Sequence, residues 1–187
     1  ENGIFNLMAK NTIKTKRNYS IASNPTTDRQ LRFNIRIALP PMGKNYYAGV
    51  GSSYVFGLKP GDVVTATGPF GDFHIKESDK EMVYSGGGAG MAPIRSHLSY
   101  LLDSVQSKRR ISYWYGARSL KELYYETYFE QLAKKNNNFS FKVALSEPEA
   151  NDAWLSFTGF IHDVVEKEFL KNSLILIDWN FIYVVLL

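Results

Sequence analysis

The apolar and polar positions of this chain follow two different periods, and the change falls near residue 78. Over residues 31–39 the odd positions are apolar and the even ones mostly polar, which predicts a half-buried antiparallel strand. The other expected elements of this half are strands at 17–23 and 63–67, turns at 24–28, 59–62 and 68–73, and a short apolar turn or helix at 54–58. Residues 1–77 are therefore predicted to be all-β, as part of an antiparallel barrel or sandwich.

From residue 78 onward, predicted strands alternate with predicted amphipathic helices. Ile94, Leu98, Leu101 and Val105, for example, share one face of a helix. The expected strands are 82–85, 111–115 and 139–145, and the expected helices are 92–105, about 119–135 and about 158–170. Such alternation predicts a parallel sheet covered by helices on both faces, with ligands bound beyond the carboxyl ends of the strands.

A glycine-rich turn joins the first of these strands to its helix. The turn reads Gly86-Gly87-Gly88-Ala89-Gly90-Met91-Ala92-Pro93. Glycines let the backbone approach a phosphate, and the N–H groups at a helix start attract negative charge. The turn therefore predicts a site for the pyrophosphate of a nucleotide cofactor. It departs from the Rossmann fingerprint, because Pro93 stands where Gly or Ala is expected and the next strand does not end in an acidic residue. A β–α turn without a ligand is the alternative.

Two more loops are expected at the same edge of the sheet, since parallel strands all end there. They are Gly116–Ser119 and residues 146–148.

In the β-rich half, Arg17, Tyr19 and Ser20 share one predicted strand. A guanidinium can bind phosphate through paired hydrogen bonds, and a tyrosine ring can pack on another ring. Gly49–Ser53 offers a second phosphate-binding loop before a short helix. The alternative to a binding site is that Arg17, Tyr19 and Ser20 are ordinary strand residues and that Arg17 is simply exposed.

Composition narrows the function classes. At 187 residues and 44% hydrophobic residues, the chain is long enough for one domain or two small ones with real cores. The net charge of +4 is modest, and the sequence contains no dense block of lysine and arginine, so we expect no nucleic-acid partner. The absence of cysteine excludes disulfides, thiolate metal sites and cysteine nucleophiles from this chain. His74, His97 and His162 lack metal-ligand spacing, so no metal is expected.

The motifs together resemble a known family. Arg17-Asn18-Tyr19-Ser20, Gly68-Pro69-Phe70-Gly71 and the glycine-rich turn occur in the order found in the ferredoxin–NADP⁺ reductase-like flavoproteins. Residues 17–170, including 112–119 and 158–162, look most like the branch that serves as flavoprotein subunits of Na⁺-translocating NADH:quinone oxidoreductases. The resemblance implies an FAD-binding β-barrel domain over 1–77 and an NADH-binding α/β domain over 78–187.

The resemblance also implies an oxidoreductase activity and its partners. Hydride would pass from NADH to FAD, and electrons would leave through a 2Fe–2S domain toward quinone, coupled to sodium export. The partners would be NADH, quinone indirectly, and the other subunits of a membrane respiratory complex at the cytoplasmic face of the bacterial inner membrane. No side chain is required as an acid or base, because the protein positions and tunes the two rings.

The resemblance assigns site residues as well. Arg17 would bind the FAD pyrophosphate, Tyr19 and Ile21 would lie at the flavin, and Ser20 would lie near its reactive N5 as the catalytic position. The FAD phosphates would be held by Gly49, Gly51, Ser52 and Ser53. The NADH pyrophosphate would be held by Gly87, Gly88, Ala89, Gly90, Met91, Ala92 and Pro93, and its adenosine side by Tyr115, Gly116, Ala117, Arg118 and Ser146. Arg118 alone favours NADPH, through a 2′-phosphate, whereas the resemblance implies NADH, which we expect.

Several family segments are not in this sequence. They are an N-terminal membrane anchor, a cysteine-rich ferredoxin domain and the opening strands of the barrel. The similarity ends near Lys171, where the family continues into a Cys-Gly-Pro-Pro segment. We interpret the chain as a fragment whose tail arises from truncation or a reading-frame slip, with 174–178 as a fourth parallel strand. The tail is too short for a membrane span, which needs about 20 apolar residues.

The fragment itself is accordingly expected to be soluble, to bind FAD poorly and to be inactive. Two alternatives stay open. One is a nucleotide-binding remnant without catalysis, and the other is a stand-alone ferredoxin-type NAD(P)H reductase.

Overall fold

The computed structural model describes residues 11–39, 48–171 and 179–183, and the chain divides into two compact units. The first unit comprises Glu1–Tyr19 and Ile35–Phe73, and the second comprises Ser20–Asn34 and His74–Leu187. Residues 20–34 thus belong with the α/β part, although they precede the boundary expected near residue 77. Among the described residues, no helix combines the length and the apolar character that crossing a membrane requires.

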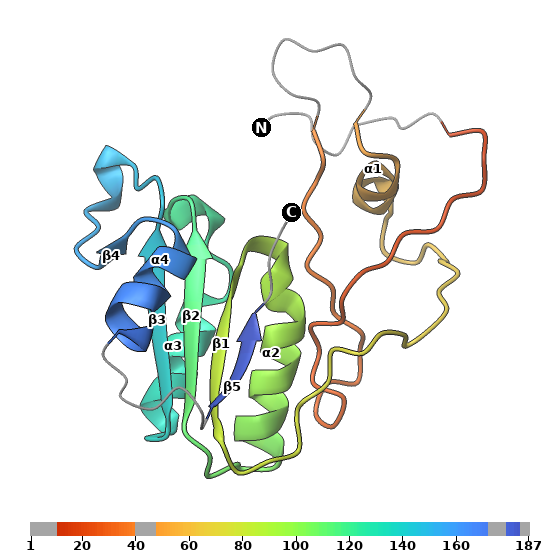
Figure 1. Ribbon diagram of the computed structural model, residues 1–187. Helices are drawn as coiled ribbons and strands as arrows, with labels where there is room; N and C mark the ends of the chain where they lie inside the picture. The colour runs from red at the N-terminus through yellow and green to blue at the C-terminus, as the bar shows by residue number, and fades with distance from the viewer. Residues whose placement is uncertain (1–10, 40–47, 172–178, 184–187) are drawn as a thin grey trace. The chain divides into compact units, whose positions relative to one another are not determined.

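The second unit is built on a five-stranded sheet in which every neighbouring pair is parallel (Figure 1). The order across the sheet is β4-β3-β2-β1-β5. The strands are β1 (Glu81–Gly87), β2 (Ile111–Ala117), β3 (Phe139–Leu145), β4 (Phe157–Thr158) and β5 (Trp179–Tyr183). The predicted parallel sheet is confirmed. The expected strand at 174–178 lies outside the described residues, and the strand beside β1 is 179–183 instead.

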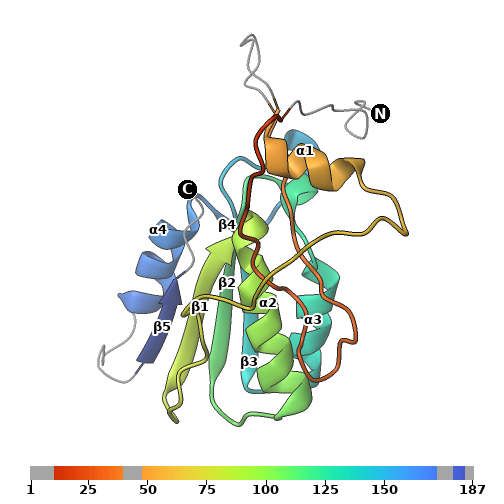
Figure 2. The ribbon, with the colours of Figure 1, turned by 90° about the vertical axis from the view of Figure 1, so that its right-hand side faces the viewer.

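Helices cover both faces of this sheet, as predicted (Figures 1 and 2). On one face lie α2 (Met91–Ser99), which continues as a π-helical turn over Tyr100–Ser104, and α3 (Glu126–Lys135). On the other lies α4 (Ile161–Val165), followed by a π-helical turn over Glu166–Leu170. Alternate residues of each strand point to opposite faces. Met82 and Tyr84 therefore pack with α2 and α3, while Val83 packs with α4.

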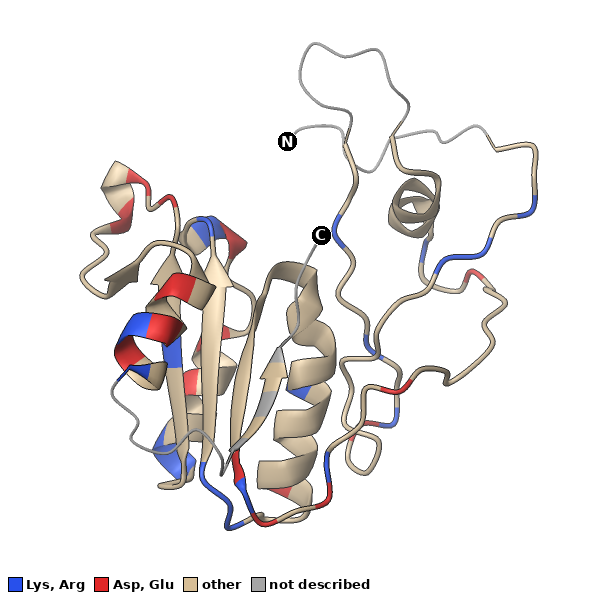
Figure 3. Ribbon diagram, viewed as in Figure 1, with Lys and Arg blue, Asp and Glu red and all other residues tan. Residues whose placement is uncertain are grey.

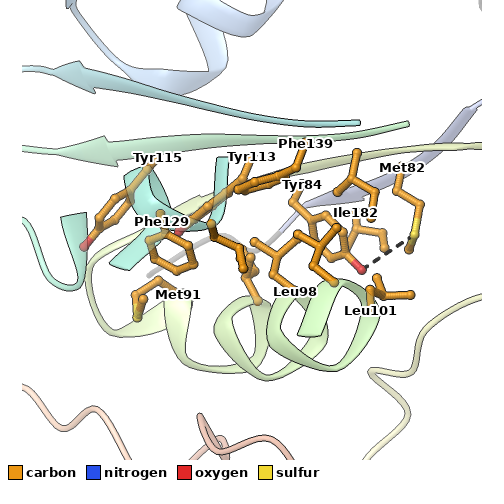
Figure 4. Packing of buried hydrophobic residues seen from close by; sticks show 14 of the residues in the cluster. Met82, Tyr84, Met91, Leu98, Leu101, Tyr113, Tyr115, Phe129, Phe139 and Ile182 are labelled. Carbon is orange, nitrogen blue, oxygen red and sulfur yellow. Dashed lines mark hydrogen bonds between the residues drawn. The ribbon is translucent and has the colours of Figure 1, made fainter. Parts of the chain in front are cut away.

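The larger of the two cores is rich in aromatic rings (Figure 4). The Tyr113 ring stacks on Tyr115 with centroids 5.6 Å apart and meets Phe129 edge-on at 5.0 Å. Aromatic pairs in these geometries contribute about 0.5–1.5 kcal/mol beyond the area that they bury. The α3 side of the sheet is thus held by rings from β2 as well as by aliphatic side chains of α2.

Two helices begin later than the sequence predicted. The segment expected as one helix from about 119 is a 3₁₀ turn over Leu120–Glu122, and α3 starts at Glu126. The Tyr124 N–H donates to the Tyr115 hydroxyl, and Tyr125 adopts a left-handed φ of 59°, so the helix cannot be continuous there. In the last helix, β4 occupies 157–158 and Gly159 has a φ of 107°, which delays the start of α4 to Ile161.

The first unit contains one described helix, α1 (Val50–Gly57), and no paired strand among its described residues. The prediction of a strand at 63–67 was wrong, because these residues pair with no other strand among the described residues, and Val63 is 92% exposed. A strand is stable only where its N–H and C=O groups meet those of a neighbour, and none of the described residues supplies that neighbour. The turn expected at 59–62 is present, with the Asp62 N–H donating to the Lys59 carbonyl.

The expected strands at 17–23 and 31–39 meet at one point only. Ile21 and Phe33 form a single antiparallel bridge, and the Ala22 N–H donates to the Arg32 carbonyl. The predicted turn at 24–28 is confirmed, because the Asp28 N–H donates to the Asn24 carbonyl. We call residues 20–34, which belong to the second unit, the 20–34 hairpin.

Candidate functional site

The glycine-rich turn lies at the carboxyl end of β1, where the strand order reverses. The chain moves from β1 through β2 and β3 to β4 and then returns to place β5 on the other side of β1. Ligands of open α/β sheets bind at such a reversal. Gly87 is extended, Gly88 has a φ of 54°, and Gly88–Gly90 form a 3₁₀ turn that runs directly into α2. Pro93 lies in the first turn of α2, as its missing N–H allows.

Close packing requires glycine at position 87 of this turn and at its partner, position 116. A Cβ atom on Gly87 would lie 1.7 Å from the carbonyl oxygen of Gly116, its register partner on β2. A Cβ on Gly116 would in turn lie 2.8 Å from Cβ of Ile161 on α4. The left-handed conformation of Gly88 is a separate requirement, since other residues rarely adopt it. Gly87 and Gly88 are only partly buried and carry no side chain, so a ligand can approach their backbone closely.

The predicted meeting of three loops at this edge is confirmed. The Ser146 N–H donates to the Ala117 carbonyl at 2.9 Å, and the Glu147 N–H donates to the Arg118 carbonyl at 2.8 Å. The Arg118 guanidinium donates to a Glu147 carboxylate oxygen at 2.8 Å, and the hydrogen bond and charge of Glu147 raise the pKa of Arg118. Both side chains are more than half exposed, so they remain accessible to a ligand.

Tyr115 is placed differently from the other residues expected at the adenosine side. Its ring is fully buried in the α3-side core, and its hydroxyl accepts the Tyr124 N–H at 3.1 Å. Burial raises the pKa of this phenol to about 12. Only the backbone of Tyr115 therefore reaches the edge. The alternation along β2 could have indicated this burial, because Ile111, Tyr113 and Tyr115 lie on the same face of the strand.

The first unit brings together a second set of predicted residues. Gly49 is the N-cap of α1, so residues 50–53 form its first turn rather than a loop before the helix. A Cβ on Gly51 would lie 2.7 Å from Cγ of Arg17 and 2.8 Å from the Tyr19 hydroxyl. Arg17 and Tyr19 therefore lie against the start of α1.

The start of α1 has the donors that a phosphate group requires. The first N–H groups of a helix have no partner within it, and the Ser53 hydroxyl is buried without a hydrogen-bond partner. Ser52 is instead occupied, since its hydroxyl accepts from the Ala38 N–H and donates to the Gly49 carbonyl. This set fits a flavin nucleotide. The pyrophosphate can meet the Arg17 guanidinium, the Ser53 hydroxyl and the first N–H groups of α1, and the flavin ring can pack on Tyr19.

Ser20 and Ile21, which follow Arg17 and Tyr19 in the chain, belong to the second unit. Ser20 is exposed, and Ile21 forms the bridge to Phe33 in the 20–34 hairpin. The predicted flavin residues are therefore divided between the units, with Ser20 and Ile21 in the unit that carries the glycine-rich turn.

Arg95 is a residue that sequence reasoning did not single out. It lies on α2 and is only 7% exposed, and it is the one Lys, Arg, Asp or Glu of Met91–Ser99 (Figure 3). Its guanidinium donates to the Ala22 carbonyl and lies 3.6 Å from the Asp28 carboxylate. A lone charge within an otherwise uncharged helix was the available signal, since a buried charge needs a partner.

The carboxyl of Asp28 makes this attachment sensitive to acid. The backbone N–H of Asn24 lowers the pKa of Asp28, and the nearby Arg32 and Arg95 lower it further against the opposing effect of burial. A group with a depressed folded pKa stabilises the protein above its unfolded value of about 4, and this contribution disappears as the pH falls through the folded value.

We expect Asp28→Asn to reduce the free energy of unfolding by about 0.5–1 kcal/mol at pH 7, and by progressively less as the pH falls below about 4. Thermal unfolding of both proteins between pH 7 and pH 2 measures the difference. The exposed Asp163→Asn variant is the control. A difference between Asp28→Asn and the unsubstituted protein that does not change with pH would contradict the assignment.

The histidines do not assemble a metal site in the described residues. His74 and His162 are exposed, while His97 is buried on α2 with its Nδ1 3.4 Å from the Tyr84 hydroxyl. Within 11–39, 48–171 and 179–183, no three His, Cys, Asp or Glu side chains group in a way that could hold a metal ion.

Comparison with known proteins agrees with this geometry. Residues 85–185, more than half of the chain, match the family model of the oxidoreductase NAD-binding domain, and residues 4–75 match that of the oxidoreductase FAD-binding domain. A subunit of the Na⁺-translocating NADH-quinone reductase of Shewanella putrefaciens is 49% identical over 91% of this chain and 56% of its own length. The corresponding subunit from Yersinia enterocolitica is 51% identical over 84% of this chain and 39% of its own length.

Solved structures give the fold. An Amycolatopsis cytochrome P450 reductase is 27% identical, with a TM-score of 0.71 over 88% of this chain and 46% of its own. A ferredoxin–NADP⁺ reductase from Plasmodium falciparum has a TM-score of 0.74 at 22% identity, over 92% of this chain and 68% of its own. The chain spans about half the length of the curated relatives it matches. It belongs to the family of oxidoreductase NAD-binding domains, here preceded by an oxidoreductase FAD-binding domain in the order of the ferredoxin reductase-like flavoproteins.

Proposed function

We propose that the chain transfers hydride from NADH, bound at the glycine-rich turn of the second unit, to FAD, bound at the start of α1 in the first. The glycine-rich turn at the strand reversal carries this proposal, because its backbone can meet a pyrophosphate at the point where α/β sheets bind nucleotides. When bound, FAD supplies the acceptor: hydride from NADH and one proton from solvent give the two-electron-reduced flavin and NAD⁺.

The residues of this chain bind and orient the two nucleotides. Gly87–Gly90 and the N-terminal turn of α2 hold the NADH pyrophosphate through backbone N–H groups. Gly116, Ala117, Arg118 and Ser146 form the adenosine side. In the first unit, Arg17 and the first turn of α1 hold the FAD pyrophosphate, while Tyr19 packs on the flavin and Ser20 and Ile21 approach its reactive edge.

In the longer protein that the relatives represent, we propose that the electrons continue toward quinone. Relatives that are about half identical to this chain are named as a subunit of Na⁺-translocating NADH-quinone reductase. Passage through a 2Fe–2S domain, coupling to sodium export and assembly with the other subunits at a membrane complete this proposal. These steps need segments beyond the part of the relatives that matches this chain.

The proposed activity is tested by titrating this chain and the longer protein with FAD and NADH and following NADH oxidation with ferricyanide. We expect the longer protein to hold FAD and to oxidise NADH, and the 187-residue chain to bind FAD weakly. A longer protein that binds FAD without oxidising NADH would refute hydride transfer. Tight FAD binding by the chain alone would refute the expected weakness of its flavin unit.

A nucleotide-binding protein without catalysis is the second candidate. One observation favours it: Val63 and Phe70 of the first unit are 92% and 85% exposed, and the described part of that unit has no paired strand. Exposed apolar side chains of this kind indicate a flavin unit that lacks a closed core. If the longer protein binds NADH and never FAD, this candidate replaces the first.

The Arg118–Glu147 pair predicts a preference for NADH over NADPH. A 2′-phosphate near Arg118 would meet the negative charge of Glu147, which already holds the guanidinium. We expect Glu147→Gln to improve kcat/KM for NADPH by about three- to tenfold relative to NADH, a modest effect because both side chains are exposed. Steady-state rates with the two cofactors measure it, and Glu168→Gln, in the π-helical turn after α4, serves as the control. An unchanged ratio would exclude this pair from cofactor choice.

A further inference from the structure

Arg95 is a buried cation with four partners in the second unit. Besides the Ala22 carbonyl and the Asp28 carboxylate, its guanidinium lies over the rings of Tyr125 and Tyr128, 4.9 and 5.0 Å from their centroids. Arginine can combine these contacts because its planar group donates at its edge and stacks on its face. Arg95 thus joins α2, the start of α3 and the 20–34 hairpin at one point.

The hairpin is attached to α2 on both sides of Arg95. The Ser96 hydroxyl donates to the Ser23 carbonyl at 2.8 Å, and the Asn24 amide donates to the Ser104 hydroxyl at 2.9 Å. At the other end, the Asn34 amide group contacts the sulfur of Met91, in the first turn of α2, and accepts from the Tyr125 hydroxyl at 3.2 Å. The hairpin therefore follows α2 from its first turn to the π-helical turn at its end.

This attachment links the residues assigned to the two nucleotides within one unit. The hairpin begins with Ser20 and Ile21, which the proposed function places at the flavin. The helix to which it is attached begins at the glycine-rich turn, which the proposed function assigns to NADH. Since hydride transfer needs reacting atoms about 3–3.5 Å apart, a displacement of about 1 Å between these elements can slow it by about a hundredfold.

We propose that Arg95 is a positioning residue for hydride transfer. It fixes the 20–34 hairpin, which begins with Ser20 and Ile21, to α2, the helix that follows the glycine-rich turn. This inference rests on the proposed function. It assigns to Arg95 no contact with either nucleotide. Its effect is on the geometry of transfer, and the affinity for NADH is set by the turn itself.

The test uses the longer protein with bound flavin and three variants. Arg95→Met keeps an unbranched apolar stem and removes the guanidinium group with its charge, and Arg95→Lys keeps the charge and loses the planar group. The matched control is Arg110→Met, an exposed arginine in the connection before β2. Hydrogen exchange of the hairpin amides reports the attachment. Stopped-flow mixing with NADH gives the rate of flavin reduction at saturation and the dissociation constant of NADH separately.

For Arg95→Met we expect hairpin amides to exchange at least about tenfold faster while those of β1 to β3 keep their protection. Flavin reduction should slow by about 10- to 100-fold, with the NADH dissociation constant changed by less than about threefold. Arg95→Lys should recover part of both effects, and Arg110→Met should show neither. If Arg95→Met fails to fold, Arg95→Lys and Asp28→Asn carry the same comparison with smaller effects.

Three results would overturn the inference. They are hairpin exchange equal to that of Arg110→Met, faster exchange throughout the sheet, and a loss of NADH affinity at an unchanged reduction rate. The two proposals can also fail separately. If NADH does not reduce the flavin of the unsubstituted protein, the proposed function fails and the positioning role with it. If NADH reduces the unsubstituted protein and Arg95→Met equally fast, only the positioning role fails.

Discussion

Replacing Gly87 by alanine is expected to destabilise the second unit by about 4 kcal/mol or more. The new Cβ would overlap the carbonyl oxygen of Gly116, 1.7 Å away, and the obstacle is backbone at the carboxyl end of the parallel β1–β2 ladder. The carbonyl can move only if β1 and β2 separate at their carboxyl ends. That separation would break the packing of Gly116 on α4 and displace the turn that is proposed to bind NADH.

Urea unfolding followed by circular dichroism measures this effect, and Ser85→Ala supplies the matched control two residues earlier on β1. The Ser85 hydroxyl is buried without a hydrogen-bond partner. Its removal should leave the stability unchanged or raise it by about 1 kcal/mol, because an unsatisfied polar group is lost. Equal unfolding midpoints for Gly87→Ala and Ser85→Ala would show that the two strands are farther apart than described.

In the longer protein, replacing Arg17 by methionine is expected to weaken FAD binding by about 10- to 100-fold. Charge-assisted hydrogen bonds from a guanidinium to a phosphate contribute about 1.5–3 kcal/mol, which corresponds to that range. Arg17 is exposed and lies against Gly51 at the start of α1, where the helix N–H groups add to the same site. The FAD affinity of Arg17→Lys should lie between those of the unsubstituted protein and Arg17→Met, since lysine keeps the charge and loses the paired hydrogen bonds.

Quenching of flavin fluorescence measures the affinity, and Lys16→Met is the control because it removes an exposed positive charge from the neighbouring position. The dissociation constant of NADH should not change in any of the three variants, since the glycine-rich turn belongs to the other unit. If Lys16→Met weakens FAD as much as Arg17→Met, general attraction of the phosphates explains the result and the site assignment is wrong.

The order of elements in the second unit could be predicted because each has its own period. The apolar positions of β1 to β3 and α2 recur locally, and such recurrence survives in any packing that buries one face. The starts of α3 and α4 could not be placed in the same way. They depend on the Tyr124–Tyr115 hydrogen bond and on the left-handed residues Tyr125 and Gly159, which a helical period does not register.

The candidate site likewise has one part that could be predicted from the sequence and one part that could not. The glycine-rich turn could be recognised in the sequence, because a cluster of glycines directly after a strand is uncommon unless the backbone must turn tightly or meet a ligand. The role of Arg95 does not, since a charged residue on a helix is usually exposed and only its burial against Ala22, Asp28 and two tyrosine rings reveals it. Residues 31–39 do alternate between apolar and polar positions, yet within the described part of the chain they form a single bridge, from Phe33 to Ile21.

By itself the sequence determined which residues face a core, where the chain turns and which backbone can approach a phosphate, since these follow from side-chain period and from glycine and proline. The tertiary structure alone decided that Gly87 and Gly116 touch, that the Tyr115 ring is buried and that the 20–34 hairpin is fixed to α2. Each of these depends on atoms distant in the chain, and a local pattern shows that a residue needs a partner without showing which one it meets.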